Sequence, residues 1–234
     1  MGRTCVEVRG LTVSIQRRTI LEEVSFSVCD EVLGIAGPNG SGKSTLLRSI
    51  ERAAWRQNDA VRIGDPAMTA PRVGYLPQGF DMPKGMTVRE FVEYAAWIKN
   101  SATVRASAAE AIEAAQLGAF ADRRLGHVSG GVAQRTGFAS VLVDAPDVLL
   151  LDEPTTGVDI HQREVMREII AAQSPGRTTI LSSHIAEDLE QLCDRILVLV
   201  KGRPRFLGSV DEARAETGEE TLSGALLSLT AGVE

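Results

Sequence analysis

The run Val32-Leu33-Gly34-Ile35-Ala36 leads directly into Gly37-Pro38-Asn39-Gly40-Ser41-Gly42-Lys43-Ser44-Thr45. The first part is continuously apolar, which is typical of a parallel strand buried on both faces. The second part has the G-x-x-x-x-G-K-[ST] spacing of a phosphate-binding loop, and residues 43–52 continue in a helical pattern. A buried strand, this loop and a helix, in that order, predict an α/β fold that binds a nucleotide.

The loop suits a nucleoside triphosphate for physical reasons. Its glycines let successive backbone N–H groups converge on phosphate oxygens, and the following helix presents its positive end to the same anion. Lys43 adds a positive charge for the β- and γ-phosphates, and the Ser44 hydroxyl can ligate Mg²⁺. We therefore expect residues 37–45 to bind a nucleoside triphosphate with Mg²⁺.

Two further apolar runs end in polar residues. Residues 148–151 lead to Asp152-Glu153-Pro154, and residues 178–181 lead to Ser182-Ser183-His184. The carboxyl ends of parallel strands form the ligand crevice of an open α/β sheet. Asp152 can hold the Mg²⁺ hydration shell there, and Glu153 can polarise a water for attack on the γ-phosphate.

The rest of the chain divides into three regions. Residues 4–35 look like strands, and apolar and polar side chains alternate between Val6 and Val28 as in half-buried antiparallel strands, whereas residues 87–145 show helical spacing. We predict an α/β phosphate-loop NTPase with a mainly parallel sheet, an N-terminal antiparallel β subdomain and an inserted α-helical subdomain. Its domain spans residues 1–218 with the insertion at about 79–145, and residues 219–234 form a short helix or a frayed tail.

Composition restricts the function classes. The chain has 234 residues, with 25 Lys and Arg against 31 Asp and Glu, a net charge of −6. An acidic chain without a basic run is a poor nucleic-acid binder. The longest uncharged stretch, residues 221–233, is shorter than the roughly 17–25 residues of a membrane span, and the N-terminus has no apolar signal region. Three scattered cysteines (Cys5, Cys29, Cys193) suit a reducing compartment better than a disulfide or zinc.

Four more segments complete a pattern that resembles the ATP-binding cassette family, the nucleotide-binding subunits of ABC transporters, over about residues 4–215. Tyr75-Leu76-Pro77-Gln78 is similar to that family's Q-loop, and Val128-Ser129-Gly130-Gly131 to its signature motif. Gly157-Val158-Asp159 is similar to its D-loop, and Ser182-Ser183-His184 to its switch histidine.

The resemblance implies a role for each segment. Glu153, His184 and Gln78 are the expected catalytic residues, and Ser44, Gln78 and Asp152 the expected Mg²⁺ ligands. Ser129-Gly130-Gly131 opens a helix with bare N–H groups, a second anion site. In the family this site binds the γ-phosphate held by another subunit, so we expect a homodimer or a heterodimer with a second ABC subunit, with Asp159 in the D-loop.

Three departures from the family pattern stand out. Ile15 occupies the place of the aromatic residue that stacks on adenine, Val132 replaces the usual Gln of the signature, and the turn at residues 28–32 is shorter. We expect weaker adenine binding, an intact signature and a tighter turn. Met82, Met86, Phe91 and Trp97 fit either the core of the helical subdomain or a docking groove for a membrane partner.

The predicted function is ATP hydrolysis that powers transport through separate transmembrane permease subunits. Residues 79–94 look most like subunits of exporters of drugs, antibiotics or lipids. We expect a cytoplasmic chain, peripheral on the cytoplasmic face of the cell membrane, that contacts the membrane only through its permease. The alternative is a soluble ABC ATPase that acts in repair, translation or cofactor assembly.

Overall fold

The central sheet has six strands and grows from the apolar run at residues 32–36. The computed structural model describes residues 4–55, 59–64, 71–99, 101 and 103–231. The strands run in the order β5-β6-β7-β3-β8-β9, all parallel except β9. Their bounds are β3 (Val32–Ala36), β5 (Val73–Leu76), β6 (Val148–Asp152), β7 (Thr178–Ser182), β8 (Arg195–Val200) and β9 (Arg203–Gly208). This sheet confirms the predicted fold class, although the sequence did not reveal β9.

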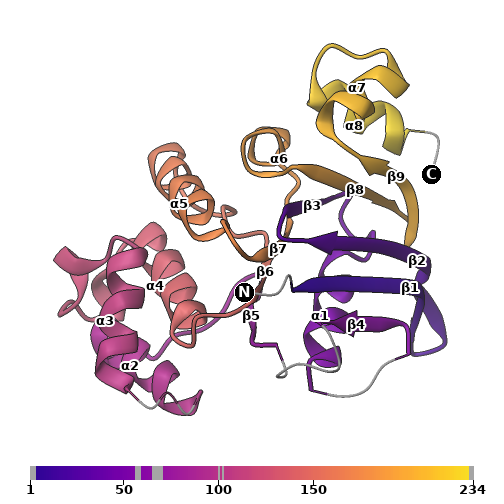
Figure 1. The fold of residues 1–234 in the computed structure, drawn as a ribbon. Coiled ribbons are helices and arrows are strands. Elements are labelled where there is room, and N and C mark those ends of the chain that lie inside the picture. Colours follow the sequence, from indigo (N-terminus) through magenta and orange to yellow (C-terminus); the bar gives the residue numbers. More distant parts are fainter. Residues whose placement is uncertain (1–3, 56–58, 65–70, 100, 102, 232–234) are drawn as a thin grey trace.

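A smaller antiparallel sheet packs beside it (Figure 1). Its order is β2-β1-β4, with β1 (Cys5–Ile15), β2 (Arg18–Cys29) and β4 (Val61–Ile63). Val6 pairs with Val28 and Val8 with Phe26, and all four side chains are buried. They share one apolar cluster with helix α1 (Lys43–Ala53) and with strands of the central sheet, so α1 packs against both sheets.

Three helices form a separate unit at one side of the central sheet (Figure 1). They are α2 (Val88–Ile98), α3 (Val104–Ala114) and α4 (Gly130–Leu142), with short 3-10 turns η1 (Gly118–Phe120) and η2 (Leu125–His127) between them. Thr87 and Glu90 form a capping box that starts α2. All three lie within the predicted insertion, whose boundaries stay a prediction.

The apolar residues near α2 separate into two groups. Met82, Met86 and Phe91 pack partly buried against the apolar cluster that helices α2, α3 and α4 share with β6 and β8, called the main core below, which fits the core interpretation. Trp97 is 65% exposed and stacks on Tyr94. Trp97 is therefore no core residue.

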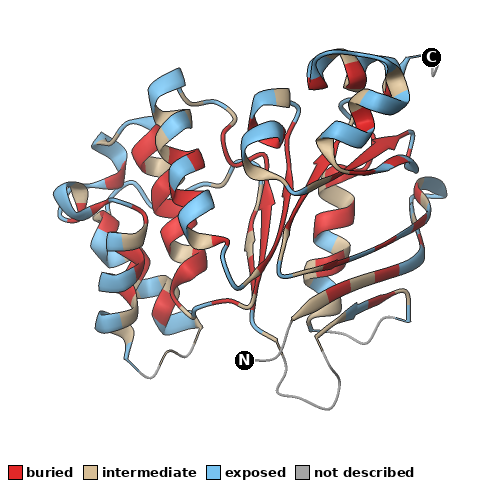
Figure 2. Ribbon diagram, turned by 45° about the horizontal axis from the view of Figure 1, so that its top comes forward, coloured by how far each residue is buried: buried red, intermediate tan, exposed pale blue. Residues whose placement is uncertain are grey.

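The C-terminal part consists of α5 (Ile160–Gln173), α6 (Ala186–Leu192), α7 (Val210–Thr217) and α8 (Leu222–Thr230). The expected tail forms α8, whose Leu222, Ala225 and Leu229 join the main core. Figure 2 shows buried residues along the central strands and on the inward sides of the helices. Residues 1–3 of the predicted domain and 232–234 of the predicted tail lie outside the described residues. In the described part of the chain no helix is long and apolar enough to cross a membrane.

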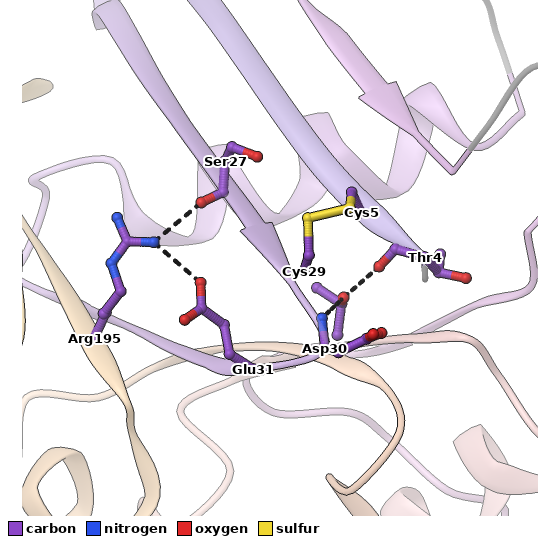
Figure 3. The surroundings of a disulfide bond; sticks show 8 residues. Thr4, Cys5, Ser27, Cys29, Asp30, Glu31 and Arg195 are labelled. Carbon is purple, nitrogen blue, oxygen red and sulfur yellow. Dashed lines mark hydrogen bonds and ion pairs between the residues drawn. A yellow bond between two sulfur atoms is a disulfide. The ribbon is translucent and has the colours of Figure 1, made fainter. Parts of the chain in front are cut away.

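The cysteine prediction is wrong for two of the three residues. Cys5 and Cys29 lie directly opposite each other in the β1–β2 register and form a disulfide (Figure 3). Their partnership depends on strand register, which spacing in the sequence does not reveal. Cys193 is free, and burial raises the pKa of its thiol far above the usual value. The cysteines therefore give no support to a reducing compartment.

The turn after Cys29 is held by contacts to two strands of the central sheet (Figure 3). The Asp30 N–H donates to Thr178 Oγ1 at 2.9 Å, and the Arg195 guanidinium donates to Glu31 Oε1 at 3.0 Å. Asp30 has a φ of +50°, a conformation that Asp tolerates better than most residues. The short turn at residues 28–32 is therefore anchored, in keeping with the expected tight turn.

Opening the disulfide should lower the free energy of unfolding by about 3–4 kcal/mol, because the bond closes a loop with a sequence separation of 24. Urea unfolding of the full chain with and without a thiol reductant measures this difference. The double variant Cys5→Ser/Cys29→Ser is the control, since reductant should leave its midpoint unchanged. An unaltered chain whose midpoint is also insensitive to reductant would contradict the pairing.

Candidate functional site

The phosphate loop has the backbone shape that its glycines allow. Gly37 has a φ of +145°, and a Cβ there would lie 2.2 Å from the Leu199 carbonyl oxygen. Gly42 has a φ of +105° and directly precedes α1, where a Cβ would lie 2.6 Å from Leu21. Both positions combine a left-handed backbone with close packing, so only glycine fits.

Lys43 points back into this loop. Its Nζ donates to the carbonyl oxygens of Gly37 at 2.8 Å and Pro38 at 3.3 Å, and it lies 3.8 Å from Glu153 Oε1. The Lys43 side chain is only 6% exposed. Burial lowers the pKa of the ammonium, and the carboxylates of Glu153 and Asp152 partly oppose that shift. The cation is thus already placed inside the loop.

One buried polar atom of the loop has no partner in the described part of the chain. Ser41 Oγ is buried and makes no hydrogen bond. Buried hydroxyls normally have a hydrogen-bond partner. A hydroxyl left in this state between Gly37 and Lys43 fits a phosphate oxygen as its missing acceptor.

Adjacent strands β6 and β7 bring the acidic pair and the histidine together. Ser182 Oγ donates to Asp152 Oδ1 at 2.7 Å and accepts from the Glu153 N–H at 2.9 Å. His184 Nδ1 lies 2.7 Å from Glu153 Oε2, which also accepts from Thr156 Oγ1 at 2.8 Å. Glu153 has a φ of +51°, an uncommon conformation that surrounding contacts must hold.

Asp152 is fully buried and its second oxygen is weakly engaged. Tyr75 OH lies 3.5 Å from Asp152 Oδ2 and accepts from Arg48 Nε at 3.4 Å. Burial raises the pKa of the Tyr75 phenol, so it stays a neutral donor. Ser182 and Tyr75 therefore belong to the site, although no separate role was predicted for either of them.

The remaining predicted residues make no hydrogen bond to this centre among the described residues. Gln78 is exposed and follows β5, which is parallel to β6, so it lies at the same sheet edge as Glu153. Asp159 is the N-cap of α5 and accepts from the Gln162 N–H at 2.9 Å. Ile15 lies at the end of β1 and is 51% exposed.

The signature segment starts α4 and presents two open backbone positions. Ser129 caps the helix by accepting from the Val132 N–H at 3.4 Å, and Ser129 and Gly130 are exposed. Gly131 is buried, and a Cβ there would lie 2.5 Å from Gln162 Cγ. Val132 is part of the main core, which explains an apolar residue where the family has Gln.

Ile15→Tyr should tighten ATP binding, by up to roughly 1–3 kcal/mol if the aromatic ring stacks on adenine. The exposed end of β1 leaves room for the ring. Ser14→Tyr is the matched control, because it adds the same ring on the opposite face of β1. Titration with labelled ATP measures both affinities. No gain from Ile15→Tyr would mean that adenine lies elsewhere.

Comparison with known proteins agrees with this geometry. The family model described as "ABC transporter" matches residues 21–156. A "Nod factor export ATP-binding protein I" from Paraburkholderia xenovorans (strain LB400) is 34% identical over 215 residues, covering 87% of this chain and 70% of the relative. The protein of the same name from Rhizobium sp. (strain N33) is 33% identical over 223 residues, covering 89% and 72%.

Two solved structures are also similar. One described as "Structure of ATP binding subunit of ABC transporter" has a TM-score of 0.79 at 23% identity and covers 96% of this chain and 98% of its own. A "bacterial Atm1-family ABC exporter with ATP bound" has a TM-score of 0.75 at 28% identity, covering 92% and 40%. The first likeness concerns the fold alone.

The fold and the phosphate loop define an ATP-binding P-loop ATPase. The family match covers the loop, the Q-loop and the acidic pair. The chain belongs to the ABC transporter family, as an ATP-hydrolysing nucleotide-binding subunit that works with transmembrane components. The resemblance inferred from the motifs is thereby confirmed.

Proposed function

We propose that the chain is the ATPase subunit of an exporter, working at the cytoplasmic face of the cell membrane. The relatives are named for export, and the ATP-bound neighbour is an exporter. A drug, an antibiotic or a lipid is the proposed class of cargo. The observation that carries the ATPase assignment is the continuous contact from Lys43 through Glu153 to His184.

The site residues support a direct mechanism. Glu153 Oε2 is occupied by His184 and Thr156, which leaves Oε1 facing Lys43. When Lys43 moves onto the phosphates, Oε1 is free to accept a proton from the attacking water. His184 keeps the carboxylate in place during this step.

Mg²⁺ fits the proposed ligands. Ser44, Gln78 and Asp152 offer a hydroxyl, an amide and a carboxylate oxygen, which are ligands that Mg²⁺ prefers. Among the described residues, Oδ2 of buried Asp152 accepts only the long hydrogen bond from Tyr75 OH at 3.5 Å, so this oxygen is available as a metal ligand. When bound, the ion neutralises charge on the phosphates.

The proposed working unit contains two ABC chains. Ser129, Gly130 and Gly131 form a helix start in which Ser129 and Gly130 are exposed, and Asp159 caps the neighbouring helix. A Cβ built on Gly130 would lie 3.9 Å from the Gly157 carbonyl oxygen, so the signature and the D-loop are side by side. This joint surface is the proposed contact with a second chain's nucleotide, in a homodimer or a heterodimer.

The proposed permease contact is a cleft of about 930 Å³ between the end of α1 and the helical unit. Trp55 and Ile98 line it as large exposed apolar side chains. Lys99 and Asp144 also line it and form an ion pair at 3.6 Å. An apolar opening with charges at its edge suits a short amphipathic helix from the cytoplasmic side of a permease.

Co-purification from membranes tests the exporter assignment. The full chain should bring down a membrane-spanning polypeptide, and Trp55→Asp should abolish this while the circular dichroism spectrum is unchanged. Leu227→Asp is the control, because Leu227 is 69% exposed on α8 and lines no part of the cleft. A chain found only in the soluble fraction, without such a polypeptide, would favour the non-transport ABC ATPase instead.

A further inference from the structure

A buried ion pair lies behind the catalytic edge of the sheet. Asp188 on α6 is 1% exposed and Arg167 on α5 is 4% exposed, with 3.5 Å between Asp188 Oδ1 and an Arg167 guanidinium nitrogen. Buried carboxylates are costly unless they are paired and hydrogen-bonded. The burial of the Asp188 carboxylate therefore requires its ion pair and hydrogen bonds, and the same contacts hold the partner side chains in place.

The other oxygen of Asp188 joins two segments of the site. Thr155 Oγ1 and Ser183 Oγ both donate to Asp188 Oδ2, the latter at 3.1 Å. Thr155 lies two residues after Glu153, and Ser183 lies directly before His184. One carboxylate oxygen thus contacts the segment that carries each member of the Glu153–His184 pair.

The regular β6–β7 ladder ends at the pair Asp152 and Ser182. Past it, the described backbone hydrogen bonds to neighbouring strands are single ones, from the Glu153 N–H to the Ser182 oxygen and from the Ser183 N–H to the Ile35 oxygen, each at 3.2 Å. Beyond that point Glu153 has a positive φ, and its carboxylate lies 2.7 Å from His184 Nδ1. A conformation of this kind persists only where several contacts hold it.

We infer that Asp188 is a positioning residue for ATP hydrolysis, whose Oδ2 holds the Glu153 segment against the His184 segment. Asp188 does not touch the phosphate loop among its described contacts, so it acts through Thr155 and Ser183. The inference rests on the proposed roles of Glu153 and His184. Asp188 should therefore affect the rate of hydrolysis and not the affinity for ATP.

Two substitutions of nearly equal size test this role. Asp188→Asn keeps an oxygen that can accept from both hydroxyls, whereas Asp188→Leu fills the space without any acceptor. In ATPase assays of the full chain, Asp188→Leu should lower kcat on the order of 10–100-fold with KM for ATP within about twofold, because small displacements of reacting groups are costly. Asp188→Asn should recover most of that loss.

The neighbouring acid provides a matched control. Glu187 also pairs with Arg167, at 3.3 Å, but it is 56% exposed and contacts neither Thr155 nor Ser183. Glu187→Ala should leave kcat within about twofold, since only a solvent-exposed ion pair is lost. A role limited to charge balance for Arg167 would instead make the two acids similar.

Equal kcat in the unaltered chain, Asp188→Asn and Asp188→Leu would overturn the inference, whatever the thermal midpoints are. If Asp188→Leu does not fold, Thr155→Val and Ser183→Ala replace it, because each removes one donor at nearly constant volume. Each should lower kcat, and unchanged kcat in both would again overturn the inference. Glu153→Gln is assayed beside them. Full turnover in Glu153→Gln would contradict the proposed role of Glu153. If Glu153→Gln loses turnover while Asp188→Leu keeps the unaltered rate, only the positioning role of Asp188 is rejected.

Discussion

Glu153→Gln is expected to lower the rate of ATP hydrolysis by roughly 10²–10⁴-fold, the usual contribution of a general base, while ATP binding is retained. Gln has the size of Glu and can accept the hydrogen bond from Thr156, so the turn with positive φ should survive. Its amide cannot take a proton from water. Single-turnover hydrolysis and ATP titration on the same preparation separate the two effects.

Two comparisons make this result specific. Glu164→Gln is the matched control, because Glu164 is a half-exposed acid on α5 that pairs with Arg167 away from the phosphate loop. Its turnover should match that of the unaltered chain. Lys43→Ala should lose ATP binding itself, since it removes the buried cation from the loop. Turnover of Glu153→Gln within about threefold of the unaltered rate would remove Glu153 from the role of base.

Local patterns predicted the parts of the site that lie next to one another in sequence. The buried strand at residues 32–36, the glycine loop and α1 are one continuous segment, so their order alone predicts the phosphate cradle. Asp152 and His184 each follow an apolar strand, and parallel pairing then places them at one edge. These predictions needed no knowledge of long-range contacts.

Features that depend on contacts between distant segments of the chain could not be predicted from local sequence patterns. Cys5 meets Cys29 only because of the β1–β2 register. Asp188 reads as an ordinary acid in the first turn of a helix, and its burial against Arg167 appears only when α5 packs on α6. Strand β4 is too short to show alternation. In each case the signal lies in tertiary contacts and not in local composition.

Packing also decides which glycine of the signature should be altered. A Cβ on Gly131 would lie 2.7 Å from the Gln162 Cβ, so any substitution there disturbs the contact between α4 and α5 within one chain. A Cβ on Gly130 meets nothing closer than 3.9 Å. Gly130 therefore tests contact with a second chain without a change inside the first.

Gly130→Asp should leave the ATP affinity of the single chain nearly unchanged and abolish both ATP-dependent dimerisation and hydrolysis. The new carboxylate would face the triphosphate bound by the other chain, where like charges repel. Gly118→Asp is the matched control, because Gly118 is exposed on the same helical unit and a Cβ there meets no atom within 4 Å. Gly118→Asp should dimerise normally.

Size-exclusion chromatography with ATP, in a Glu153→Gln background, measures the effect, because slow hydrolysis lets the dimer accumulate. The Gly118→Asp chain should shift to dimer size when ATP is added, and the Gly130→Asp chain should remain at monomer size. The phosphate loop belongs entirely to one chain, so ATP should still protect a Gly130→Asp monomer against thermal unfolding. A Gly130→Asp chain that dimerises as the control does would contradict a shared nucleotide site, and the assignment of residues 37–45 would be unaffected by that outcome.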